Sequence, residues 1–214
     1  MIHRIVARLG FWPRTLVALT LTATIVTLGV EGRAVADTSA YELYCPGSPV
    51  GNIAFNGVIT TGSLSPSAPA KGESFSITDF QTTFSVPIPI VDATAALGNT
   101  TISGYIGSIL DVSGAKPAKL TENESLSSTI PSTVTNPLPV LAPSSPVVVG
   151  PLNATGSSVV VTVNAHVTLA VSVTPGESGR KVRCLIYPNN ATASGLDVKK
   201  PSGSPVAPVI AKSG

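Results

Sequence analysis

Apolar and polar residues alternate most regularly late in the chain, between residues 159 and 173. Every odd-numbered position there is Val, Ala or Leu, whereas most positions between them carry Thr, Asn, His or Ser. A period of two places one face of a β-strand in the core and the other in water. A straight strand of this length would reach about 50 Å, whereas a domain of this size has a radius of gyration of about 16 Å. We therefore predict a long strand that is bent, or that breaks near Asn164 and Ala165.

Shorter β-type patterns occur along most of the remaining chain. They predict strands at residues 41–45, 53–61, 75–79, 82–88, 101–111 and 181–187. Turn-forming residues separate them, such as those at 46–47, 56–57, 113–114 and 188–190. One helical turn is predicted at residues 92–97, with Asp92 as its N-cap and Gly98 just past its end.

Proline and polar residues mark two segments that differ from these strands. Residues 129–151 contain six prolines, and because proline cannot donate to a central ladder, we expect an edge strand and a crossover between two sheets. Residues 198–214 begin with a polar, proline-containing stretch and are predicted to form a flexible tail. Residues 37–197 are then one all-β domain, a two-sheet antiparallel sandwich of immunoglobulin-like type.

The first 36 residues have the pattern of an export signal. Arg4, Arg8 and Arg14 supply positive charge, residues 15–30 form an apolar run, and Ala34 and Ala36 are the small residues that a signal peptidase requires. Cleavage would place Asp37 at the start of the mature chain. The protein is therefore expected to be secreted, either extracellular or in the cell envelope.

Removing this leader changes the charge of the chain. The leader holds four of the thirteen basic residues and one of the eleven acidic residues, so nine basic and ten acidic residues remain. The mature chain is therefore nearly neutral, and composition gives no support for a nucleic-acid partner or an anionic membrane. The remaining sequence also lacks an apolar run long enough to span a membrane.

Cys45 and Cys184 are the only cysteines, and both follow the leader. In an oxidising compartment they are expected to form one disulfide that joins the first and last strands. A metal site would need further ligands near them, and none is close in sequence. We predict neither a metal nor a cofactor.

Candidate catalytic residues are few. His166, the only histidine after the leader, lies on the polar face of the alternating segment. It is interpreted as an exposed strand residue, because no motif supplies the nucleophile and carboxylate that a catalytic base needs. Ser113 and Lys116 match the Ser-x-x-Lys pattern of penicillin-interacting enzymes, but Gly114 and Pro117 oppose the helix on which that motif sits. The match is interpreted as chance.

The carboxylates and the sequons carry little functional signal. Asp79, Asp92 and Asp111 lie among predicted turns, and Glu122 and Glu124 are interpreted as a solvated loop. A glycosidase would need two carboxylates facing each other across a groove. Sequons for Asn-linked glycans occur at Asn99, Asn123, Asn153 and Asn190.

Several short motifs resemble exported actinobacterial proteins of unknown function, especially mycobacterial ones. The resemblance covers residues 41–196 and rests on Tyr44-Cys45-Pro46-Gly47, Val50-Gly51-Asn52, Thr60-Thr61-Gly62, Ala96-Leu97-Gly98-Asn99-Thr100, Gly150-Pro151 with Ala154-Thr155-Gly156, and Cys184 with Tyr187-Pro188-Asn189-Asn190. These motifs are turn and disulfide signatures. The resemblance implies a fold and an exported location, and it brings no catalytic residues.

Three functions are compatible with this sequence. The first is a non-catalytic β-sandwich that acts at or near the cell envelope as a binding or structural module. The second is a carrier for a small apolar ligand or lipid between the sheets, with a cavity lined by Phe84, Val86, Ile88 and Ile90 beside Val140 and Leu141. The third is a secreted hydrolase. We favour the first, which is not an enzyme.

Overall fold

The computed structural model describes residues 39–48, 51–172 and 179–213, which belong to one compact unit. The predicted leader and its cleavage residues Ala34, Ala36 and Asp37 lie outside the described residues. Within them no helix is long and apolar enough to cross a membrane.

The fold is mostly antiparallel sheet and sandwich-like, with one disulfide, as predicted. In chain order, the elements that the structure describes are β1 (Tyr41–Ser48), β2 (Gly51–Ser65), β3 (Ser74–Val86), α1 (Ile88–Ala96), β4 (Thr101–Ser113), β5 (Ala115–Lys116), β6 (Lys119–Thr129), β7 (Leu138–Ala154), β8 (Val160–Val163), β9 (His166–Ser172), β10 (Arg180–Pro188) and β11 (Val209–Lys212).

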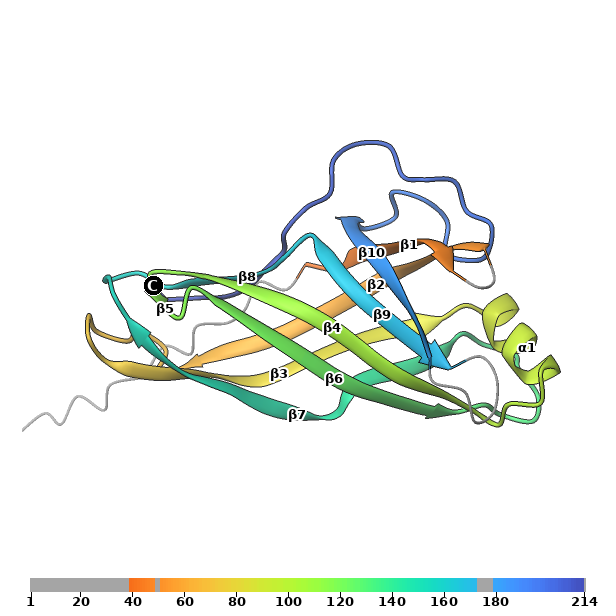
Figure 1. Ribbon diagram of the computed structural model, residues 1–214, viewed down its shortest axis with the longest axis horizontal. Helices are drawn as coiled ribbons and strands as arrows, with labels where there is room; N and C mark the ends of the chain where they lie inside the picture. The colour runs from red at the N-terminus through yellow and green to blue at the C-terminus, as the bar shows by residue number, and fades with distance from the viewer. Residues whose placement is uncertain (1–38, 49–50, 173–178, 214) are drawn as a thin grey trace, which may run out of the picture. The chain divides into compact units, whose positions relative to one another are not determined.

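Two sheets share strand β2 (Figure 1). In sheet A, β4 pairs with β6 on one edge and with β8 and β9 on the other; β10 follows β9, and β1 lies between β10 and the first part of β2. In sheet B, the second part of β2 pairs with β3, followed by β7 and the short β5. The inward faces of both sheets contribute to one hydrophobic core.

The predicted break near Asn164 and Ala165 is confirmed. Strands β8 and β9 both run along β4, with Val163 opposite Leu110 and Thr168 opposite Gly107. Four residues of one strand therefore face two residues of the other, which preserves the inward parity of the valines. The break lets β8 pair with β11 while β9 pairs with β10.

The structure has no turn at Asn56 and Gly57, where one was predicted, because β2 continues through both residues. Asn-Gly usually signals a hairpin, but here the pair forms an irregularity inside β2, between the residues that face Tyr41 and Leu43. Gly57 takes a positive φ of 67° that suits a bulge. The bulge is held from outside, because Ser194 Oγ accepts a bond from Asn56 N (2.7 Å) and Asn189 Oδ1 accepts one from Gly57 N (2.8 Å).

The two strands predicted at residues 75–79 and 82–88 form one strand, β3. Register shifts on both sides of Asp79, which has a φ of 56°, show why the pattern seemed to break there. An irregularity interrupts the alternation without ending the strand.

The proline-rich segment behaves as predicted. Residues 130–137 cross from β6 in sheet A to β7 in sheet B, and β7 has only the two-residue β5 on its outer side. Most of that side needs no hydrogen-bond donors, so the strand tolerates its prolines.

Helix α1 begins earlier than predicted. It spans Ile88–Ala96 and its N-cap is Pro87, so the prediction that Asp92 is the N-cap is wrong. Proline has no N–H to lose and suits the first turn of a helix. The predicted end is correct, because Gly98 follows the helix with a φ of 83°.

The prediction of a flexible tail from residue 198 is wrong for its last part. Residues Val209–Lys212 form β11 on the free edge of β8, and Ile210 and Ala211 are buried. Ser213 completes the contact: its Oγ accepts a bond from Val159 N (2.7 Å), and its N–H donates to Val159 O (2.9 Å). A polar, proline-containing start therefore concealed a short apolar strand.

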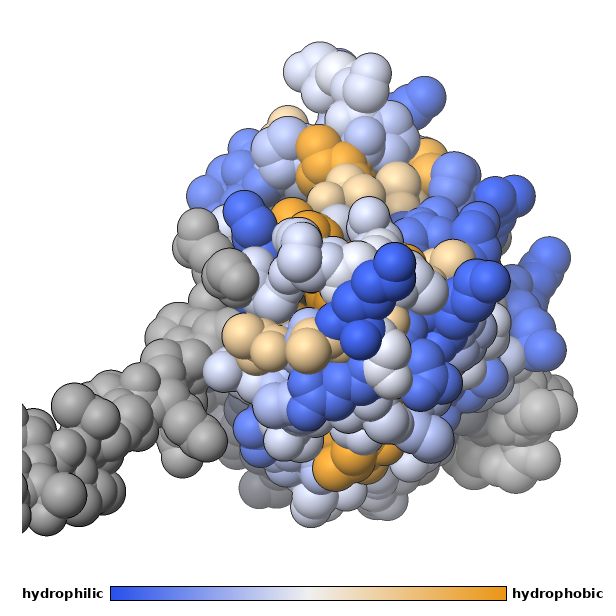
Figure 2. Space-filling model, turned by 90° about the vertical axis from the view of Figure 1, so that its left-hand side faces the viewer, coloured by the Kyte–Doolittle hydropathy of each residue, from blue (hydrophilic) through white to orange (hydrophobic). Residues whose placement is uncertain are grey.

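The end of the unit that carries β5 and β8 has a mixed surface. In Figure 2, which faces this end, hydrophobic residues form small separate groups among hydrophilic ones. Scattered apolar residues of this kind are ordinary on a protein surface and mark no docking face.

We expect Ile210→Ala to lower the free energy of unfolding by about 3 kcal/mol, because it removes a side chain that is only 1% exposed and leaves a cavity. The matched change Val209→Ala, at a neighbouring residue that is 38% exposed, should lower it by less than about 1 kcal/mol. Urea unfolding measures both values. Equal losses would show that the last strand is not packed in solution.

Candidate functional site

The outer face of sheet A arranges side chains in rows that run across four strands. Asn123 of β6 lies opposite Gly107 of β4, Gly107 lies opposite Thr168 of β9, and Thr168 lies opposite Arg183 of β10. Because side chains alternate between the two faces of a strand, these positions share the outer face. Gly107 has no side chain, so the row is low in its centre and polar on both sides.

The neighbouring row carries a second cation. Ser125, Tyr105, Ala170 and Lys181 lie opposite one another in the same strand order. The Lys181 ammonium lies 5.8 Å from the centre of the Tyr105 ring, across the small Ala170, which is a cation–π distance. The ring therefore holds Lys181 over the sheet, on the same strand as Arg183.

These rows border an open hollow of about 480 Å³. We name it the sheet A groove, lined by Gly107 and Ile109 of β4, Thr121 and Asn123 of β6, His166 and Thr168 of β9, and Lys181 and Arg183 of β10. Its volume lies within the range of about 300–1,000 Å³ that is typical of ligand sites. A second hollow, of about 410 Å³, adjoins it beside Pro46 and Gly47 and shares His166, Lys181 and Arg183.

The groove is positively charged although the whole chain has a net charge of only +2. Lys181 and Arg183 are exposed and have no ion-pair partner in the part of the chain that the structure describes. No carboxylate is among the lining residues of either hollow. The one ion pair among the described residues, Lys119 Nζ to Asp111 Oδ1 at 3.5 Å, neutralises its own two charges outside the groove.

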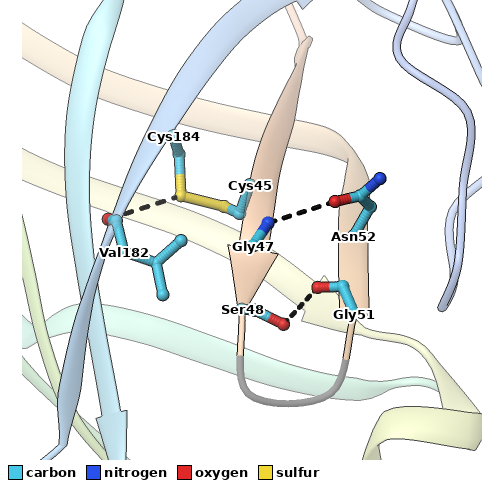
Figure 3. Close-up of a disulfide and its surroundings, with 7 residues drawn as sticks. All are labelled: Cys45, Gly47, Ser48, Gly51, Asn52, Val182 and Cys184. Atoms are coloured by element: carbon cyan, nitrogen blue, oxygen red, sulfur yellow. Dashed lines mark hydrogen bonds between the residues drawn. A yellow bond between two sulfur atoms is a disulfide. The ribbon is translucent and has the colours of Figure 1, made fainter.

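The disulfide supports the groove from below. Cys45 of β1 and Cys184 of β10 are bonded with their Cα atoms 4.1 Å apart, and both are fully buried (Figure 3). Cys184 directly follows Arg183 and Cys45 precedes Pro46, so the bond ties both sides of the second hollow together. The pairing is confirmed, but β10 is the last strand but one, because β11 follows it.

Local hydrogen bonds also join the end of β1 to the start of β2 (Figure 3). Gly47 N donates to Asn52 Oδ1 (3.1 Å), and Ser48 Oγ donates to Gly51 O (2.5 Å). Gly47 has a φ of 66°, a conformation that glycine adopts without strain. Gly47, on the rim of the second hollow, is therefore tied to Asn52 of β2.

His166 is an exposed strand residue, as interpreted from the sequence, and it lies in the groove. Its backbone N–H donates to Asn164 Oδ1 (3.1 Å). Ser113 and Lys116 are exposed on β4 and β5, on either side of the Gly114 turn, and a helix does not bring them onto one face. The Ser-x-x-Lys match therefore has no structural counterpart.

Glu122 and Glu124 are not in a solvated loop, and that interpretation is wrong. Both lie in β6, at alternate positions whose side chains face the interior. Glu124 is only 4% exposed, and neither of its carboxylate oxygens has a hydrogen-bond partner in the described structure. The polar residues around them concealed an amphipathic strand whose inward face includes two carboxylates.

Burial raises the pKa of Glu124 to about 8, and the charge of Glu122 adds to this effect. Burial likewise raises the pKa of Tyr41 to about 12; the Thr60 hydroxyl opposes this shift, and the charge of Glu124 increases it. The Tyr41 hydroxyl is hydrogen-bonded to Thr60 Oγ1 (2.7 Å), which is bonded to Thr82 Oγ1 (2.9 Å). The interior thus contains a polar layer drawn from several strands.

The interior beside α1 holds a small apolar cavity. Phe84, Val86 and Ile90, three of the residues expected to line a ligand cavity, do line it, whereas Val140, Leu141 and Ile88 do not. Its volume is about 50 Å³, which is several times smaller than a typical ligand site. The space accommodates a small chemical group and not a lipid.

Glu42 is a second buried carboxylate, on the outer face of β1. Its Oε2 accepts a bond from Thr192 N (2.7 Å), and Asn56 Nδ2 donates to Thr192 O (2.7 Å). Burial raises the pKa of Glu42, while bonds from the backbone of Thr192 and Ala191 lower it. Glu42 therefore anchors the segment after β10 against β1 and β2.

The other sequence candidates do not assemble into a site. Among the described residues, no group of three or more His, Cys, Asp or Glu side chains has the arrangement of a metal site. Asn123, at one of the sequons, lies in the sheet A groove. The sequence concealed the groove because Glu122 and Glu124, which flank Asn123, were interpreted as a solvated loop. Only strand register brings Thr121 and Asn123 beside Thr168 and Arg183.

Comparison with protein-family models, curated proteins and solved structures finds no match for this chain. The resemblance to exported actinobacterial proteins therefore stays a prediction.

We expect reduction of the disulfide to lower the free energy of unfolding by up to about 5 kcal/mol, because the bond closes a loop across a sequence separation of 139 residues. Denaturant unfolding with and without reductant measures the loss. Mass analysis of unreduced, alkylated protein is the control. Alkylation of both cysteines without reductant would contradict the bond.

We expect stability to fall as pH rises through the titration of Glu124. Its folded pKa of about 8 exceeds the ordinary value of 4.5, so the neutral form stabilises the fold fully below pH 4.5 and this contribution is lost as pH rises through about 8. The loss approaches about 1.4 kcal/mol per pH unit in this window. Denaturant unfolding at pH 5 and pH 9 measures it.

Glu124→Gln should remove most of this pH dependence, because the amide resembles the neutral acid. Glu73→Gln, at an exposed glutamate, should leave it unchanged. Wild-type protein that is equally stable at pH 5 and pH 9 would contradict a buried carboxyl at residue 124.

Proposed function

We propose that this chain is an exported, non-catalytic binding protein of the cell envelope that holds its ligand in the sheet A groove. The observation that carries the proposal is the contrast between the two faces of sheet A. The outer face has a hollow of about 480 Å³ with polar side chains from four strands, whereas the largely filled inner face leaves about 50 Å³ beside α1.

Location outside the cytoplasm is supported by two independent features. The N-terminal pattern has the charge, apolar run and small residues of an export signal. The buried Cys45–Cys184 disulfide is of a kind that persists in oxidising compartments.

The lipid carrier is the weaker alternative because the interior cavity is too small. The interior cavity is lined mainly by apolar residues from both sheets and α1, as a carrier requires, although Ser48, Thr94 and Arg180 also line it. A lipid needs several hundred Å³, so the helix and strands would have to separate before one could enter.

A secreted hydrolase is the third alternative. His166 lies in the groove, where a substrate would be accessible. A histidine base is normally oriented by a carboxylate, and the described residues that line the groove include none. The groove is therefore better suited to holding a ligand than to cleaving one.

The test is retention of the exported protein on fractionated envelope material. We expect wild-type protein to be retained by at least one fraction and Gly107→Val to lose at least tenfold of this affinity, because its side chain fills the groove. A Cβ at Gly107 would meet Asn123 Oδ1 at 2.9 Å and Thr168 Cβ at 3.5 Å. The flexible Asn123 tip can move, so the fold should survive.

Ser127→Val is the matched control, because Ser127 is exposed on β6 and does not line the groove. The unfolding midpoints of both variants should stay close to that of wild type. Retention that Gly107→Val does not change would overturn the proposed site. Turnover of hydrolase substrates that His166→Ala abolishes would overturn the non-catalytic part of the proposal.

A further inference from the structure

We infer that the ligand of the sheet A groove is an anionic glycan, a sugar chain that carries carboxylate or phosphate groups. This inference rests on the proposed function and adds the chemical class of the ligand.

Basic residues are concentrated on β10, beside the groove. Lys181 and Arg183 stand two residues apart on β10, so both side chains project from the outer face. Arg180, at the start of the strand, alternates to the other face; it lines the adjoining hollow and also the interior cavity beside α1. Three of the nine basic residues of the mature chain therefore lie within four positions of one strand, in a region whose lining contains no carboxylate.

Lys181 and Arg183 are already partly positioned before a ligand binds. The Tyr105 ring lies 5.8 Å from the Lys181 ammonium and restricts where it can move. Arg183 is followed directly by the disulfide-bonded Cys184, so its backbone is fixed against β1. A guanidinium presents paired donors that match carboxylate and phosphate oxygens. Groups held in place lose less conformational entropy when a ligand binds.

The neutral residues that line the groove are suited to sugar hydroxyls. Thr121, Asn123 and Thr168 offer hydroxyl and amide groups that can donate to and accept from sugar hydroxyls. The Tyr105 ring faces Lys181, so it is not free to stack on a base. Single-stranded nucleic acids depend on aromatic stacking as well as charge. The lining therefore favours a glycan over a nucleic acid.

The combined extent of the two hollows favours a chain over a single small anion. The two hollows meet along Lys181 and Arg183, which form a positively charged ridge between them. A single small anion would contact one side of this ridge. A chain can lie across both hollows and place an acidic group on each cation.

The experiment measures binding of the exported protein to polygalacturonate, dextran phosphate, neutral dextran and single-stranded poly(dT) at low and high salt. We expect at least one of the two acidic polymers to bind at least tenfold more tightly than dextran or poly(dT). Its affinity should fall as salt rises, because exposed charges are screened.

The decisive variant is Lys181→Gln with Arg183→Gln, which should weaken binding to the acidic polymer at least tenfold. The matched control is Lys199→Gln with Lys200→Gln, which removes the same charge from two exposed lysines outside both hollows. The control should change the affinity less than twofold. Equal losses in the two double variants would overturn the site, because they would indicate non-specific attraction.

The remaining outcomes separate this inference from the proposed function. If dextran binds as well as the acidic polymers, and Gly107→Val but not the Lys181 and Arg183 variant abolishes binding, the groove stands and the anionic class is overturned. If poly(dT) binds most tightly, the glycan class is overturned. If Gly107→Val changes neither envelope retention nor polymer binding, the proposed function itself fails.

Discussion

Strand β1 is the constraint on which the rest of the structure depends. It pairs with β10 on one edge and with β2 on the other, so it is the link between the strands around β4 and those around β3. β1 and β10 are far apart in sequence, and the entropy of closing the loop between them opposes their pairing. The Cys45–Cys184 bond removes much of that loss from the unfolded chain and keeps β1 against β10.

The groove follows from this arrangement. Once β10 is fixed, β9, β4 and β6 continue the same sheet, and their outer side chains align in rows. Gly107 and Ala170 keep the middle of the surface low, while Lys181 and Arg183 stand beside them. A chain whose net charge is only +2 thus acquires a local concentration of positive charge on this surface.

The strand that lines one side of the groove also places carboxylates in the interior. Strand β6 turns Asn123 outward to the groove, and the same alternation turns Glu122 and Glu124 inward. An inward carboxylate disfavours burial when ionised, which is why burial raises the pKa of Glu124. Inward charges on edge strands also discourage pairing with other chains, and β6 has a ladder partner on one side only, namely β4.

The sequence by itself determined the features that depend on local period and composition. Alternation predicted most strands and the break near Asn164, the prolines predicted the edge strand and crossover, and the cysteine content predicted the disulfide. Only tertiary structure decided that Glu124 is buried, that Ile210 belongs to a strand, and that Asn123, Gly107, Thr168 and Arg183 form one row. The physical reason is that register joins residues distant in sequence, and no local pattern records which strand supplies the neighbour.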